Sequence, residues 1–168
     1  GLSACQTQAP PPPVAFEPEP EPEPAAGWRA VALAEDEERI DRLPLAWQEA
    51  LGQARSAGFG RRIAAEGPLL DPGAALPRAA PPPGPYRCRL IRFGAGRPVT
   101  AYQPYFCLVD VEGEQLSLTK QEGSERPGGY LWEESGRRLV FLGAVAFRGE
   151  PLPPGYGEDR DRSLVGVV

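Results

Sequence analysis

The sequence predicts an α+β fold, mainly β, in which a helical segment packs on an antiparallel β meander that tends towards a small barrel-like sheet. Between residues 28 and 67, apolar side chains recur every three or four positions. From residue 86 onwards they alternate with a period of two, and turn residues separate these segments without intervening helices. We expect strands beyond Val168 to complete the sheet, because residues 163–168 read as a strand cut short.

Composition excludes several function classes. The chain has 22 Pro and 20 Gly, so the folded part is smaller than the whole. It has no His, which is the commonest general base and neutral metal ligand. The net charge of −5 provides no basic face for nucleic acid. We therefore expect no cofactor, no metal, no nucleic-acid partner and no enzymatic activity.

The first five residues, GLSAC, resemble a bacterial lipobox, the end of a lipoprotein signal peptide. Lipidation of Cys5 would then anchor the protein to a membrane, and no run of about 18 apolar residues offers a spanning helix instead. Gln6 rather than Asp after the cysteine favours the outer membrane. We expect an exported periplasmic lipoprotein whose natural chain begins upstream; a stray cysteine is the alternative.

Residues 6–27 form the predicted tether. Residues 9–26 read APPPPVAFEPEPEPEPAA, and alternating Glu-Pro favours extended polyproline II geometry. At about 3.1 Å per residue, this tract spans roughly 55 Å. We interpret it as a disordered spacer; the alternative is a Pro-rich ligand for a partner module.

A single domain is predicted over residues 28–168, with a helical part at 28–67, a connector at 68–85 and a sheet at 86–168. The helix pattern has spacings of three and four, and its apolar members are Ile40, Leu43, Trp47, Leu51 and Ala54. Pro44 either kinks this helix or belongs to the first turn of a second one. Gly58 predicts a helix end, and a short helical piece is expected at 61–66.

The expected strands follow one another at short intervals, at residues 86–93, 101–111, 115–120, 130–133, 138–147 and 163–168. Residues 123–129 and 151–161 are expected as loops. A turn near Arg97-Pro98 would place Cys88 opposite Cys107, where an oxidising periplasm favours a disulfide worth about 3 kcal/mol. A redox or metal pair is the alternative.

Several ordered motifs resemble the bacterial family called domain of unknown function 4893, over roughly residues 28–168. The motifs are Leu69 to Pro72, Tyr86 to Arg89, Tyr105 to Cys107, Gly123 to Gly129, Phe141 to Gly143 and Tyr156 to Asp159. This resemblance implies an exported envelope protein with further strands after Val168 and no established activity.

The candidate binding loop contains Gly123, Ser124, Arg126 and Gly128. Its glycines let backbone amides converge on an anion, and Arg126 could clamp a carboxylate or phosphate. The alternative is a hairpin loop whose arginine bonds neighbouring carbonyls. Ser124 has no His to activate it, which leaves only a formal pairing with Lys120.

Other candidates have plainer interpretations. The adjacent Glu133 and Glu134 should point to opposite faces of a strand, so we expect no acid/base pair. Residues 158–162 could take calcium but are better interpreted as a self-paired surface loop. Aromatic residues are expected to line either a cavity or the core: Trp47, Tyr105, Trp132 and Phe141.

The sequence therefore predicts a non-enzymatic binding module that contacts an envelope protein or a cell-wall component. The alternative is a calycin-like barrel that binds a small apolar ligand. A hydrolase is the third interpretation.

Overall fold

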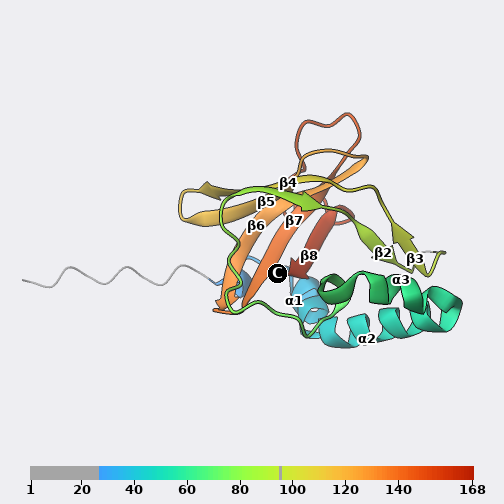
Figure 1. The fold of residues 1–168 in the computed structure, drawn as a ribbon. Helices are drawn as coiled ribbons and strands as arrows, with labels where there is room; N and C mark the ends of the chain where they lie inside the picture. The colour runs from blue at the N-terminus through green and yellow to red at the C-terminus, as the bar shows by residue number, and fades with distance from the viewer. Residues whose placement is uncertain (1–26, 95) are drawn as a thin grey trace, which may run out of the picture.

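The computed structural model describes residues 27–94 and 96–168 (Figure 1). The predicted lipobox with Cys5, and the tether up to residue 26, lie outside these residues. No helix in the described part of the chain is long and apolar enough to span a membrane.

The N-terminal part is helical, as predicted. After a 3₁₀ turn, η1 (Trp28–Ala30), come α1 (Ala34–Asp41) and α2 (Leu43–Ala54). Pro44 lies in the first turn of α2, where its missing amide leaves no helical hydrogen bond unmade, so the chain has two helices rather than one kinked helix.

Gly58 interrupts the helical path, as predicted. The turn η2 (Arg55–Phe59) carries Gly58 at a φ of 89°, a conformation that other residues rarely adopt. Helix α3 (Gly60–Ala65) and the turn η3 (Gly67–Leu70) follow, and the connector then runs to the sheet.

The main sheet has six antiparallel strands in the order β1-β4-β5-β6-β7-β8. Its strands are β1 (Gly84–Cys88), β4 (Tyr105–Glu112), β5 (Gln115–Lys120), β6 (Glu125–Ser135), β7 (Arg138–Phe147) and β8 (Ser163–Val167). The predicted antiparallel meander is confirmed. The sheet is open rather than barrel-like, because β1 and β8 are its two edges and do not pair.

The prediction of one continuous strand over residues 86–93 is wrong. The segment divides into β1 and β2 (Ile91–Phe93), and β2 pairs with β3 (Val99–Ala101) in a separate two-stranded sheet. The predicted strand 101–111 divides likewise, because Pro104, which cannot donate to a ladder, stands between β3 and β4. In Figure 1, the β2–β3 hairpin lies beside α2 and α3.

The predicted loop 123–129 is mostly strand, because β6 begins at Glu125. Its glycines serve close packing rather than a turn: Gly129 lies opposite Gly143, and a Cβ on Gly129 would overlap the carbonyl oxygen of Leu142. Pro127 lies beyond Gly128, the last residue of β6 that pairs with β5. The sequence predicts a loop here because proline and paired glycines normally mark a turn.

The described residues form two separate hydrophobic cores. One joins α2, α3, η3 and the β2–β3 hairpin, through Leu51, Ala54, Ile63, Leu70 and Val99. The other joins η1, α1 and β7, through Trp28, Ile40, Val140 and Leu142. We call the sheet face that carries Val140 and Leu142 the α1 face, and the opposite one, which carries Pro127 and Val145, the hairpin face.

Candidate binding surface

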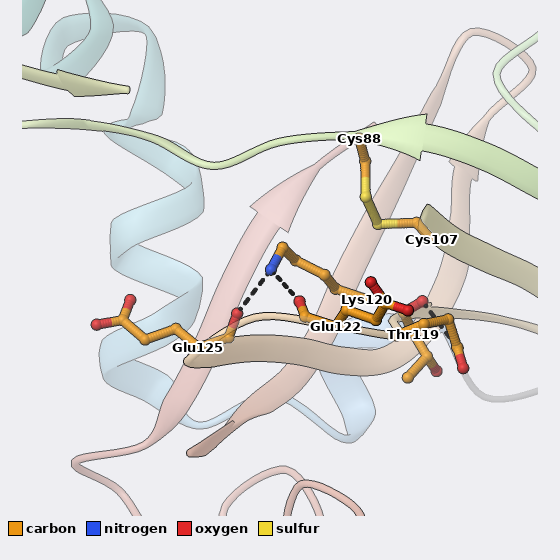
Figure 2. The surroundings of a disulfide bond; sticks show 7 residues. Cys88, Cys107, Thr119, Lys120, Glu122 and Glu125 are labelled. Carbon is orange, nitrogen blue, oxygen red and sulfur yellow. Dashed lines mark hydrogen bonds between the residues drawn. A yellow bond between two sulfur atoms is a disulfide. The ribbon is translucent and has the colours of Figure 1, made fainter. Parts of the chain in front are cut away.

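Cys88 and Cys107 form the predicted disulfide, with their Cα atoms 5.8 Å apart (Figure 2). The predicted register is wrong by two residues, since Cys88 lies opposite Tyr105 and Cys107 opposite Tyr86. The turn near Arg97-Pro98 does not set this register, because it joins β2 to β3 while β1 pairs with β4. The bridge fastens the chain that leads into β2 to the main sheet.

Lys120 lies beside this bridge, opposite Cys107, and is only 7% exposed. Its ammonium donates hydrogen bonds to the carbonyl oxygens of Glu122 and, at 3.1 Å, Glu125 (Figure 2). It also lies 4.7 Å from the centre of the Tyr105 ring. Burial, followed by the nearby Arg126 charge, lowers the pKa of Lys120 below its ordinary value. The amine thus holds the β5–β6 turn together.

Arg126 donates from Nη2 to the carbonyl oxygens of Phe147, at 3.1 Å, and Glu150. The structure thus agrees with the alternative interpretation of this segment, in which the arginine bonds neighbouring carbonyl groups rather than an anion. Gly123 occupies the β5–β6 turn with a φ of 104°, and Ser124 is exposed beside it. Gly128 is buried in β6 under Pro153, so the four residues do not form one loop.

The four predicted aromatic residues are dispersed. Trp47 packs edge-on against Phe93, with ring centres 6.0 Å apart, at the first core. Trp132 packs against the second core. Tyr105 lies under Lys120, and Phe141 is on the hairpin face, opposite Leu131. They belong to different layers of the fold.

Glu133 and Glu134 border the same groove, of about 670 Å³, contrary to the expectation from strand alternation. A β-bulge between Glu133 and Ser135 inserts an extra residue and removes the alternation. Both glutamates are exposed, and Glu134 pairs with Arg138 at 2.8 Å. The groove therefore has an ion-paired rim.

The 158–162 segment bonds largely to itself and its neighbours. Glu158 accepts the amide of Gly155 at 2.9 Å, and Asp159 accepts that of Asp161 at 3.2 Å. Arg162 pairs with Glu150, where two guanidinium nitrogens meet two carboxylate oxygens. No cluster of three metal-ligating side chains occurs among the described residues.

Tyr156, in the loop before β8, reaches α1. Its hydroxyl donates to the Asp36 carboxylate at 2.6 Å and accepts the Leu33 amide at 3.0 Å. Asp36, 1% exposed, also accepts a 2.6 Å bond from Arg39. This network locks the loop over the α1 face and so positions Leu152 and Pro153 beside β5 and β6.

An exposed apolar patch follows from this arrangement. Four large side chains on the α1 face, beyond the area that α1 covers, form it: Phe106 (61% exposed), Leu108 (37%), Tyr130 (41%) and Leu152 (71%). The first two alternate along β4, Tyr130 lies on β6, and Leu152 comes from the loop. We call these residues the apolar patch.

A groove of about 260 Å³ runs beside the patch between Tyr130 and Pro153. Gly128, Gly129 and Gly143 line it together with Tyr156, so none of these three positions adds a side chain that would narrow it. Tyr130 is oriented by a 2.7 Å hydrogen bond from its hydroxyl to Glu112. The groove can take an apolar side chain of a partner.

Sequence reasoning missed this patch, although β4 carried a signal for it. The run YFCLVDV is apolar at almost every position, so both faces of the strand are apolar. Cys107 and Val109 are buried on the hairpin face, which leaves Phe106 and Leu108 on the other. A strand near a sheet edge cannot bury both faces without a second covering layer.

Comparison with known proteins shows the family but no relative of established function. No curated protein and no solved structure matches the chain. The family model described as "Domain of unknown function (DUF4893)" matches residues 28–168, which include both cores, the disulfide and the apolar patch. The chain therefore belongs to the DUF4893 family.

Proposed function

We propose that this protein is a non-enzymatic binding module of the cell envelope that holds a partner protein at the apolar patch. The observation that carries the proposal is the grouping of Phe106, Leu108, Tyr130 and Leu152 on one face. Several large exposed apolar side chains on one face of a domain mark interaction sites. Aromatic side chains beside a groove are the usual anchors of such interfaces.

The partner presents an apolar side chain to the groove and positive charge around it. Asp110 is exposed on β4, two residues beyond Leu108 on the same face, and Glu112 lies at the groove. Rim charges of this kind contribute more to orientation and association rate than to affinity. The patch itself supplies most of the binding energy.

Site-specific photo-crosslinking in the native envelope tests this proposal. A crosslinker in place of Leu152, 71% exposed, is matched by one in place of Leu76, which is 72% exposed but lies on the connector. We expect a discrete crosslinked protein from position 152 and none from position 76. The substitution Phe106→Asp should abolish the crosslink from position 152. Equal crosslinking from both positions would contradict a specific surface.

Attachment to the outer membrane through a lipid on Cys5 is part of the same proposal. The lipobox-like start and the Pro/Glu tract support it, because a charged, extended tether holds a binding domain away from a bilayer. Labelling with a palmitate analogue tests it: we expect label in the wild type and none in Cys5→Ser. Label retained by Cys5→Ser would exclude this anchor.

A further inference from the structure

The β2–β3 hairpin and the main sheet face each other across a cleft of about 490 Å³. The hairpin packs its apolar residues into the core of α2 and α3, whereas the sheet packs its other face on α1. Two bodies with separate cores leave space between them, and this volume lies in the range of small-molecule sites. Figure 1 shows β2 and β3 on the helical side of the molecule.

The walls of the cleft are apolar. Leu90, Ile91 and Phe93 line it from the hairpin side, and Pro127, Val145 and Leu164 from the sheet. The sheet residues come from three neighbouring strands and share the hairpin face, since Pro127 lies opposite Val145 and Leu164 opposite Gly143. An apolar molecule would therefore meet apolar groups on two sides.

Two anchors hold the walls together. The disulfide of Cys88 fastens the start of the hairpin to β4. Arg92 on β2 pairs with Glu125 on β6 at 2.5 Å. Arg92 and Glu125 both line the cleft, so this ion pair forms a polar part of the wall beside the apolar side chains.

The residues that line the cleft include two carboxylates but only one cation. Arg92 and Glu125 neutralise each other, and Asp161 lines the cleft without an ion pair among the described residues. The neighbouring Arg162 bonds the Val145 carbonyl and lies 5.0 Å from the Phe147 ring, and its charge is neutralised by Glu150. Arg160 pairs with Glu35 instead, at 3.7 Å.

We propose that this cleft between the hairpin and the sheet binds a small apolar molecule that carries a positive charge, with Asp161 at the charged group. This site is separate from the apolar patch, which lies on the opposite face of the sheet. It does not need a closed barrel, because the hairpin supplies the second wall.

Displacement of the neutral fluorescent probe N-phenyl-1-naphthylamine from the full chain tests the proposal. We expect the probe to bind and to be displaced by dodecyltrimethylammonium about three-fold more tightly than by dodecanoate, the preference that one partly exposed ion pair supports. Asp161→Asn should remove that preference and leave probe binding unchanged. Because Asp161 is exposed, this variant keeps the fold.

Filling the cleft should abolish probe binding. Val145→Trp and Leu164→Trp each place an indole between the walls. Two such variants are used so that the test still stands if one of them does not fold. Leu152→Ser is the control, because it changes the apolar patch and not the cleft, and it should leave probe binding intact. Three outcomes would overturn the proposal. The probe could still bind to both tryptophan variants, or its binding could be lost with Leu152→Ser. The preference for the cationic over the anionic competitor could also survive Asp161→Asn.

Discussion

The hydroxyl of Tyr156 donates a 2.6 Å hydrogen bond to the carboxylate of Asp36, joining the loop before β8 to the first turn of α1 across 120 residues of sequence. Asp36 is almost fully buried, so its carboxylate oxygens need the hydrogen bonds from this donor and from Arg39. The pair therefore holds the loop that carries Leu152 against the α1 face.

Removing that hydroxyl should destabilise the fold. Tyr156→Phe leaves one carboxylate oxygen of Asp36 without its donor, and we expect a loss of about 1–3 kcal/mol in the free energy of unfolding. Urea denaturation followed by tryptophan fluorescence measures it. Tyr102→Phe, in an exposed segment before β4, is the matched control and should change little. Equal effects of the two substitutions would contradict the role of the pair.

The same tyrosine predicts a loss of stability in alkali. Burial, followed by the hydrogen bond to Asp36, raises the pKa of Tyr156 to about 12. In the unfolded state the tyrosine has a pKa near 10, so raising the pH above 10 deprotonates and stabilises the unfolded chain before the folded one. The contribution of Tyr156 to the free energy of unfolding is therefore fully present below pH 10 and is lost between pH 10 and 12. Denaturation at a series of pH values should show this loss in the wild type and a shallower one in Tyr156→Phe. Identical slopes would show that Tyr156 does not cause it.

Lys120 should be required for the β5–β6 turn. Lys120→Met keeps the length of the side chain but leaves the carbonyl oxygens of Glu122 and Glu125 without their donor, at a cost of about 1–3 kcal/mol. Chemical denaturation measures the cost. Arg97→Met, at an exposed turn between β2 and β3, removes a charge without a buried partner and should be nearly neutral. A neutral Lys120→Met would contradict the structural role of the amine.

The glycine pair of β6 and β7 should not tolerate a methyl group. A Cβ on Gly129 would overlap the Leu142 carbonyl oxygen, and one on Gly143 would overlap that of Gly128. We expect Gly129→Ala and Gly143→Ala each to cost roughly 3 kcal/mol, because the backbones must separate. Gly136→Ala is the control, since no atom lies within 4 Å of its Cβ position. Thermal melting compares the three, and a tolerated Gly129→Ala would show that the strands can move apart.

The disulfide should stabilise the protein substantially. The bridge closes a loop with a sequence separation of 19, for which chain entropy predicts about 3 kcal/mol. Replacing both cysteines by serine, or reducing the bridge, should lower the unfolding free energy by that amount. Reduction of the double-serine variant is the control and should have no effect. Equal stability of reduced and oxidised wild type would contradict this account.

Two strands of the main sheet could be predicted from the sequence to the residue. Both β5 and β7 match their predicted bounds, because Leu116 and Leu118 alternate clearly in one and Leu139 and Phe141 in the other. The start of β6 could not be predicted, since Pro127 and two glycines normally mark a loop. Here they are strand residues because β7 approaches too closely for a Cβ.

The candidate site was harder to predict than the fold. Cys88 and Cys107 were paired correctly from their surroundings in sequence, but their register depended on a strand order that no local signal contains. The place of Leu152 in the apolar patch depends on the contact between Tyr156 and Asp36, which crosses most of the chain. Glu133 and Glu134 share a groove only because of a bulge.

The family, the helical N-terminal part and the antiparallel meander could be predicted from the sequence, because helical and strand periodicity and the turn residues are local properties. The sequence also marks Pro44 as a position that a helix interior does not tolerate, and the structure shows it in the first turn of α2. Three features could be known only from the fold in three dimensions: which strands are neighbours, that the sheet stays open, and that Phe106 and Leu152 share an exposed face. These depend on contacts between residues distant in sequence, whose energies no local pattern encodes.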